Sequence, residues 1–138
     1  MTGSCEAFCV TGSVAVGSPR DEQDATGHAC VLRLHCALLK LRREHKALQA
    51  SDACACAAEA VDDDTIGFQR EARGEHPLLI VARLRGSGVV RVPLLTSATR
   101  VLLDTEDPAF ACGSRPPIVD IAAGSIAFSR PGAVLFEL

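Results

Sequence analysis

The sequence contains no tryptophan and no tyrosine, and its only aromatic side chains are five phenylalanines among 138 residues. Proteins that bind single-stranded nucleic acid stack bases on exposed aromatic side chains, and carbohydrate-binding modules usually stack sugar rings in a similar way. Fourteen Lys and Arg against 17 Asp and Glu give a net charge of −3, which lacks the basic surface that binds phosphate backbones. The composition therefore argues against a nucleic-acid binder and against an autonomous carbohydrate-binding module.

Long hydrophobic runs are also missing. No segment approaches the roughly 20 uninterrupted apolar residues that a membrane-spanning helix needs. Residues 1–6 contain no basic side chain, and Thr11, Gly12 and Ser13 interrupt the apolar stretch that follows, so we expect no signal peptide and a cytoplasmic location. The seven cysteines, an odd number, are then expected to stay reduced. With 48% hydrophobic residues, the chain can bury a core of its own as one domain, or as a helix with a small β domain.

Hydrophobic periodicity divides the chain into four segments. Residues 1–27 show no period and are expected to form a flexible N-terminal arm. Residues 28–50 are expected to form a long amphipathic helix, because apolar residues recur at intervals of three and four. The stripe of this helix consists of Val31, Leu34, Leu38, Leu41, His45 and Leu48. Residues 51–64 are interpreted as a connector rich in Ala and Cys, and residues 65–138 as a β domain.

Short apolar or β-branched runs separated by turn residues predict the strands of this β domain. The runs are 65–70, 77–84, 89–94, 99–104, 118–122, 125–129 and 133–138. Residues 85–88, Arg-Gly-Ser-Gly, are expected to form a hairpin turn. Several short strands with no helical pattern between them favour an antiparallel sandwich or barrel. The predicted fold is therefore mainly β, an antiparallel β-sandwich preceded by one long amphipathic helix.

Cysteine and histidine spacing raises a metal site or a Cys–His nucleophile as candidates. The residues concerned are Cys5, Cys9, Cys54, Cys56, His28, His35 and Cys36. A structural zinc site requires a second pair with matching geometry, and a nucleophile pair requires a third, orienting group; the sequence indicates neither. We therefore expect no metal, no cofactor and no catalytic cysteine, and a thiol-dependent or metal-binding protein is the weakest of three hypotheses.

Two groups of carboxylates are candidates for other chemistry. Asp62, Asp63 and Asp64 could bind calcium, but they lack the alternating ligands and the glycine of a calcium loop, so we interpret them as a solvated turn before the first strand. Asp104, Glu106 and Asp107 offer carboxylates of the kind that cleave glycosides. Because a working pair usually comes from different elements, we interpret this cluster as a turn that anchors Phe110 in the sandwich. No catalytic residue is assigned.

Three segments together resemble the end of α-amylase-family glycoside hydrolases. Residues 38–48, Leu-Leu-Lys-Leu-Arg-Arg-Glu-His-Lys-Ala-Leu, are similar to the last helix of the catalytic barrel. Residues 101–110, with Asp-Pro-Ala-Phe after a strand, and the ending from 130 to 135 resemble the C-terminal domain of malto-oligosyltrehalose trehalohydrolases, as residues 28–39 resemble the start of that helix. The pattern departs at Lys46, where proline is common, and at residues 111–113, where paired glycines are usual.

The resemblance implies a non-catalytic C-terminal part of a trehalohydrolase-like enzyme. The family releases trehalose from maltooligosyl trehalose without a cofactor, and its catalytic carboxylates lie on a barrel whose motifs do not occur in this sequence. The expected role of the chain is scaffolding. The alternative is a free-standing interaction module that docks through Val31, Leu34, Leu38 and Leu41, either on a separately encoded barrel or on a second copy of itself.

Overall fold

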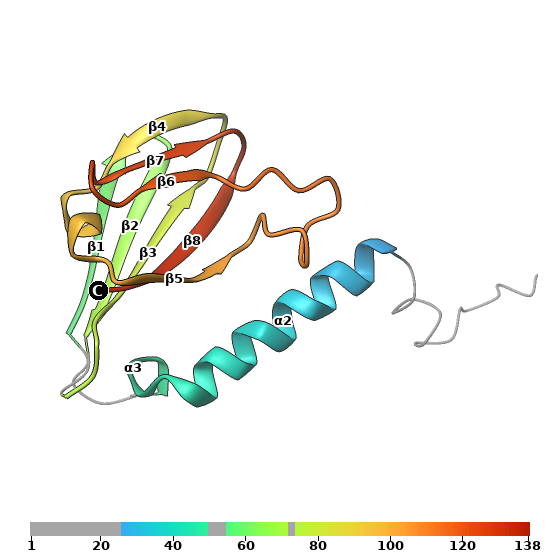
Figure 1. Cartoon of the computed structure of the whole chain (residues 1–138), viewed down its shortest axis with the longest axis horizontal. Helices are drawn as coiled ribbons and strands as arrows, with labels where there is room; N and C mark the ends of the chain where they lie inside the picture. The colour runs from blue at the N-terminus through green and yellow to red at the C-terminus, as the bar shows by residue number, and fades with distance from the viewer. Residues whose placement is uncertain (1–25, 50–54, 72–73) are drawn as a thin grey trace, which may run out of the picture.

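The computed structural model describes residues 26–49, 55–71 and 74–138 (Figure 1). Apart from residues 26 and 27, the predicted N-terminal arm lies outside these ranges. The predicted helix is present as α2 (Thr26–Glu44), followed by the single turn α3 (Lys46–Gln49). Neither helix of the described part combines the length and the apolar character needed to cross a membrane.

The rest of the described chain forms two antiparallel sheets, as the predicted sandwich requires. The first sheet has the order β1-β2-β3-β8-β5 and the second has the order β4-β7-β6. The strands are β1 (Ala55–Asp62), β2 (Thr65–Glu71), β3 (Leu78–Arg83), β4 (Gly88–Arg91), β5 (Arg100–Asp104), β6 (Ile118–Asp120), β7 (Ser125–Phe128) and β8 (Gly132–Glu137). A 3-10 helix, Pro93–Ser97, links β4 to β5.

Alternate residues of β3 and β8 enter two different clusters of buried side chains. The cluster between the two sheets contains Leu79, Val81, Val90, Val92, Leu95, Ile126, Phe128, Val134 and Phe136. Leu78 and Leu135 point to the other face of the five-stranded sheet, where Leu103 and Ala47 join them. Because both faces are covered, these central strands consist of nearly continuous apolar residues instead of alternating ones.

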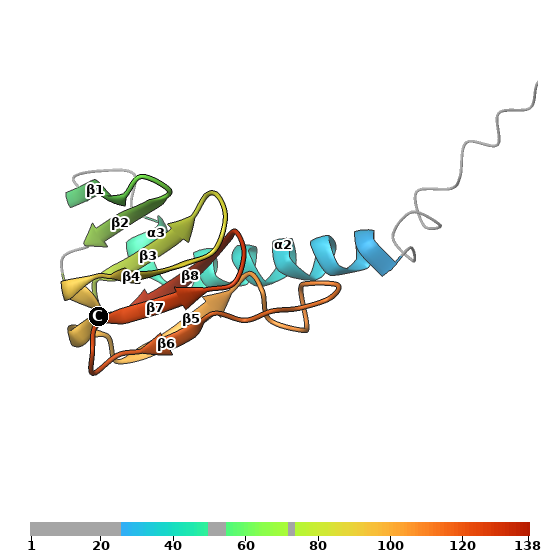
Figure 2. The ribbon, with the colours of Figure 1, turned by 90° about the horizontal axis from the view of Figure 1, so that it is seen from above.

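Helix α2 and the turn α3 cover the face of the five-stranded sheet that points away from the second sheet. Leu34, Ala37 and Leu41 of α2 pack against the second cluster, and Ala47 of α3 is only 1% exposed. Figures 1 and 2 show α2 running alongside the strands, with its N-terminal end extending past them toward the long loop between β5 and β6. The helix is therefore packed on the domain along one side only.

Three details of the sequence prediction are wrong. Residues 55–62 of the presumed connector form β1, an edge strand whose side chains at 56–60 are exposed, so neither burial nor alternation marks it. Residues 85–88 do not close a hairpin, because β3 pairs with β2 and β8 whereas β4 pairs with β7 in the other sheet. The helix also breaks at His45, where α3 turns Ala47 into the sheet cluster.

Candidate functional site

A groove runs between the two helices and the β5 edge of the larger sheet, and we call it the helix–β5 groove. Its polar end, about 340 Å³ in volume, is lined by Glu44, His45, Ala47, Glu75, His76, Arg100 and Glu137. Its apolar end, about 360 Å³, continues along α2 past Leu41, Val101, Leu102 and Phe110. The groove forms because the helix leaves the sheet edge only partly covered.

The polar end is organised around Glu137. Strand pairing places Arg100 directly opposite Glu137 on neighbouring strands, and the Nη2 of Arg100 lies 2.8 Å from Glu137 Oε2. Hydrogen bonds from Arg100 lower the pKa of Glu137, and the nearby His76 and His45 act in the same direction. A carboxylate held in its charged form is a poor proton donor near neutral pH. The polar end of the groove therefore contains a structural ion pair between Arg100 and Glu137, and Glu137 is not suited to act as a general acid.

The aspartate turn at Asp62–Asp64 lies between β1 and β2, one strand later than the sequence indicates. Arg83 reaches it from β3, with Nη1 2.8 Å from Asp62 Oδ2 and Nη2 3.7 Å from Asp64 Oδ2. The backbone N–H of Asp64, together with Thr65 and Arg83, lowers the pKa of Asp62. These carboxylates are already paired with arginine, and the turn is a structural feature.

The second carboxylate group also serves the local turn. Asp104 accepts a hydrogen bond from the backbone N–H of Glu106 at 2.9 Å, and Asp107 accepts one from the backbone of Ala109 at 2.8 Å. Glu106 is paired with Arg130. Burial raises the pKa of Asp104, and the charges of Glu106 and Asp107 add to that shift. Glu106 alone of the three is shown with a side-chain partner from another segment, and that partner is an arginine and not a second carboxylate.

The turn holds Phe110 as predicted, although not in the sandwich. The backbone N–H of Phe110 donates to the carbonyl of Asp107 at 2.8 Å. Its side chain is only partly buried and, like Leu34 and Leu41 of α2, packs against the buried cluster under the helix. Phe110 therefore links the β5–β6 loop to α2, while Phe136 fills the core between the sheets.

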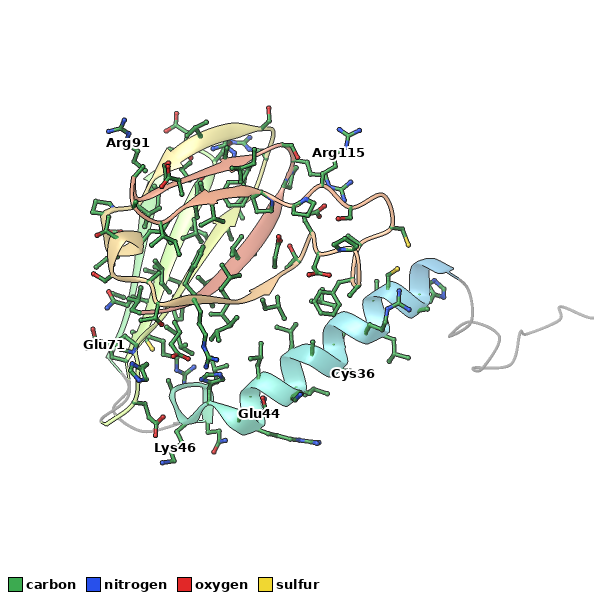
Figure 3. All side chains as sticks on the ribbon, in the orientation of Figure 1. Cys36, Glu44, Lys46, Glu71, Arg91 and Arg115 are labelled. Carbon is green, nitrogen blue, oxygen red and sulfur yellow. The ribbon has the colours of Figure 1, made fainter. Side chains whose placement is uncertain are left out.

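Within the described residues, the cysteines and histidines considered for a metal site are not brought together as a group of ligands. Cys5, Cys9 and Cys54 lie outside the described residues. Within the described ranges, no group of three His, Cys, Asp or Glu side chains is arranged to hold a metal ion. Cys56 is exposed on β1, and Figure 3 shows Cys36 on the side of α2 that faces away from the sheets. The Nδ1 of His35 lies 2.9 Å from the carbonyl oxygen of Val31, within the same helix.

The predicted helix stripe divides into two faces in the structure. Leu34 and Leu41 pack on the sheet cluster, whereas Val31 is 53% exposed and Leu38 is 43% exposed. Two further leucines, Leu32 and Leu39, are also 44% and 53% exposed. We call Val31, Leu32, Leu38 and Leu39 the outer face of α2. The sequence indicated a wide stripe but could not show which part the sandwich would cover.

Among the described residues, the outer face of α2 gathers four exposed aliphatic side chains on one helix, although Val89 and Ile118 of the smaller sheet are individually more exposed, at 71% and 76%. Asp62, Glu106 and Glu137 have arginine partners within the fold, whereas these four aliphatic side chains are exposed to solvent. The comparison of the sequence with protein-family models and with curated proteins finds no match.

Proposed function

We propose that this chain is a non-catalytic scaffolding part of a trehalohydrolase-like glycoside hydrolase, in which α2 lies between the β-sandwich and a catalytic barrel. The observation that carries the proposal is the apolar character of α2 on two sides. A helix on the surface of a single domain needs one apolar stripe, and a helix with apolar residues around most of its circumference is normally buried on both sides. The last helix of a barrel, covered by a C-terminal domain, has that environment.

The exposed fractions make the outer face a binding surface in this proposal. Single exposed leucines are common on protein surfaces, but here four exposed aliphatic side chains lie on one helix, with Val31 and Leu38 two turns apart and Leu32 and Leu39 beside them. Monomeric proteins rarely expose extended apolar patches unless these contact a partner. The same segment carries the resemblance to the barrel helix, so sequence and exposure favour the same role for it.

The chain itself contributes no chemistry in this proposal. Retaining glycoside hydrolysis needs two carboxylates about 5–5.5 Å apart, one of them protonated to act as the acid. Glu106 and Glu137 are each paired with an arginine, and Asp62 with Arg83. The partner barrel supplies the catalytic residues, and the assembly works in the cytoplasm without a cofactor. We expect the purified chain alone to release no trehalose from maltooligosyl trehalose; turnover would contradict the scaffolding role.

A complementation experiment tests the scaffold directly. A trehalohydrolase barrel produced without its own C-terminal domain is mixed with this chain, and binding and trehalose release are measured. The double substitution Val31→Glu with Leu39→Glu should abolish binding, because it places two charges in the buried contact. The matched control is Val89→Glu on β4, where the valine is 71% exposed on the other sheet. Equal binding by both variants, or no binding by the unmodified chain, would contradict the proposal.

The same outer face supports a second candidate, a free-standing module that pairs with a copy of itself through α2. Two such helices could cover each other's leucines without any barrel. Size-exclusion chromatography with light scattering distinguishes the two functions. A dimer of the unmodified chain that the double substitution converts to a monomer supports self-association, whereas a monomer over a wide concentration range excludes it.

A further inference from the structure

Two cysteines that are distant in sequence meet where α2 passes the β5–β6 loop. The Sγ atoms of Cys30 and Cys112 lie 2.9 Å apart, although 82 positions separate the residues. Cys30 is 6% exposed at the base of the contact, and Cys112 is exposed to solvent on the loop. A covalent disulfide has an S–S distance of about 2.05 Å, so a small movement of the loop would bring the sulfurs to bonding distance.

The surrounding residues hold the two cysteines together from both elements. Arg33, one turn after Cys30, donates through Nε to the carbonyl of Ala109 at 2.6 Å and through Nη2 to the Sγ of Cys30 at 3.1 Å. Phe110 of the loop and Leu34 and Leu41 of the helix pack against the same buried cluster. The loop is therefore fixed to α2 on the N-terminal side of Cys112. Gly113, with φ +70°, takes the left-handed conformation that turns the chain directly after it.

We propose that Cys30 and Cys112 form a reversible disulfide that fastens the N-terminal half of α2 to the β5–β6 loop. The oxidant is a small-molecule disulfide such as oxidised glutathione. The inference rests on the sulfur geometry and goes beyond the scaffolding role, since it holds whichever partner binds the outer face. The sequence predicts that both cysteines stay reduced, and the proposal changes that expectation for this pair.

The chemistry proceeds by two exchange steps. The thiolate of Cys112, which is accessible to solvent, attacks one sulfur of oxidised glutathione, and one glutathione thiolate leaves. The thiolate of Cys30 then attacks the Cys112 sulfur of the mixed disulfide and releases the second glutathione. Two protein thiols lose two protons and two electrons, and one glutathione disulfide becomes two glutathione thiols. The guanidinium of Arg33 donates to the Cys30 sulfur and so holds it in place beside Cys112.

The consequence of the bond is a closed connection between the helix and the sandwich. In the reduced protein, the first turns of α2 extend past the strands and are joined to the loop by the Arg33 hydrogen bonds and by packing. The disulfide would restrict that end of α2, which also carries Val31 and Leu32 of the outer face. Oxidation thus limits how far the binding helix can separate from the domain.

The tryptic map makes the disulfide directly identifiable in the full chain. Trypsin does not cleave before proline, so Cys112 is the only cysteine of the peptide 101–138, and Cys30 is the only cysteine of the peptide 21–33. The reduced protein is equilibrated with mixtures of reduced and oxidised glutathione, quenched with acid and blocked with N-ethylmaleimide before digestion. We expect a 21–33/101–138 species two hydrogens lighter than the sum, at least tenfold more abundant than any species joining 34–40 to 101–138.

Two variants keep the result interpretable. Cys112→Ser should eliminate the cross-linked species, while Cys36→Ser, an exposed cysteine on the same helix, should leave its amount unchanged. Thermal melts under reducing conditions establish that both variants fold like the unmodified chain. Oxidation should also slow amide hydrogen exchange in the first turns of α2 several-fold, and dithiothreitol should reverse this. If Cys30 and Cys112 are recovered as separate glutathione or maleimide adducts at every ratio, the proposal is wrong.

Discussion

Arg83 closes one end of the sandwich by donating from Nη1 to Asp62 Oδ2 at 2.8 Å and to the hydroxyl of Thr65 at 2.9 Å. Arg83 is 9% exposed and Thr65 is 1% exposed, so a charged group lies at the edge of the core. Its Nη2 also reaches the backbone carbonyl of Ser87 at 3.1 Å, in the segment that crosses to the other sheet. One side chain thus connects the β1–β2 turn, strand β2 and the crossover between the sheets.

Replacing this arginine should destabilise the domain strongly. Arg83→Met removes three hydrogen bonds and leaves Asp62 and Asp64 near each other without their shared cation. Asp62 and Asp64 keep access to solvent, so the main cost comes from the hydrogen bonds lost by buried groups such as Thr65, about 1–3 kcal/mol in the free energy of unfolding. Urea denaturation followed by circular dichroism measures the change.

Arg85 provides the matched control, because its guanidinium also contacts Asp64, at 2.8 Å. Its side chain is 77% exposed, and exposed ion pairs contribute about 0–1 kcal/mol. Arg85→Met should therefore change the unfolding free energy by less than about 1 kcal/mol. Equal losses in the two variants would show that burial of Arg83 adds nothing to its role.

The two phenylalanines at positions 110 and 136 should differ in their effects. Phe136 is 0% exposed in the core between the sheets, and truncation of such a ring costs about 3–5 kcal/mol. Phe110 is only partly buried under α2, so Phe110→Ala should cost about half as much or less and mainly loosen the helix. Urea denaturation and hydrogen exchange of α2 test both statements. If Phe110→Ala lowered the free energy of unfolding more than Phe136→Ala, Phe110 would belong to the sandwich core, as the sequence favoured.

The sequence predicts the helix and seven of the strands from their apolar and β-branched runs, which burial explains in most of them but not in β6, where Ile118 is 76% exposed. Strand β1 escapes detection because its register with β2 is maintained by backbone pairing, while the side chains of residues 56–60 are exposed. The crossover at residues 85–88 has the composition of a hairpin turn, and only the pairing of β4 with β7 shows otherwise. Local composition reports the presence of a turn but not which sheet the next strand joins.

The sequence shows less of the candidate site, because the residues that meet there are far apart along the chain. Arg100 and Glu137 become neighbours through the pairing of β5 with β8, and Cys30 meets Cys112 only after the helix packs on the loop. The sequence shows the apolar stripe of the helix, but it does not show which residues of the stripe pack on the sheet and which are exposed. Leu34 and Leu38 are one turn apart and offset by about 40° around the axis, which suffices to bury one and expose the other.

The Arg100–Glu137 pair should make the domain sensitive to acid. Hydrogen bonds from Arg100 lower the folded-state pKa of Glu137 below its unfolded value of about 4.3. The pair therefore contributes stability above that unfolded pKa, and the contribution is lost as the pH falls through the folded-state pKa. Arg100→Gln should destabilise the protein at pH 7, and the difference from the unmodified chain should shrink steadily below pH 4.

Arg91→Gln on β4 is the appropriate control, because it removes the same charge from an exposed arginine on the other sheet. Urea midpoints of the three proteins between pH 7 and pH 2.5 separate a local effect from a change in net charge. A destabilisation by Arg100→Gln that does not depend on pH would show that Arg100 acts through packing and not through the Glu137 carboxylate.

The reactivity of Cys112 should depend on its neighbour. The hydrogen bond with Cys30 raises the pKa of Cys112, burial and the charge of Cys30 act in the same direction, and Arg33 opposes them. Because the thiolate is the reactive form, a raised pKa means a smaller reactive fraction at a given pH. Under reducing conditions at pH 8, Cys112 should therefore react with iodoacetamide more slowly than Cys36, which is exposed on α2. Cys30→Ala should increase the rate at which Cys112 reacts with iodoacetamide and leave the rate of Cys36 unchanged. Peptide mass spectrometry can follow both rates. Unaltered Cys112 kinetics in this variant would mean that the two sulfurs do not interact in solution.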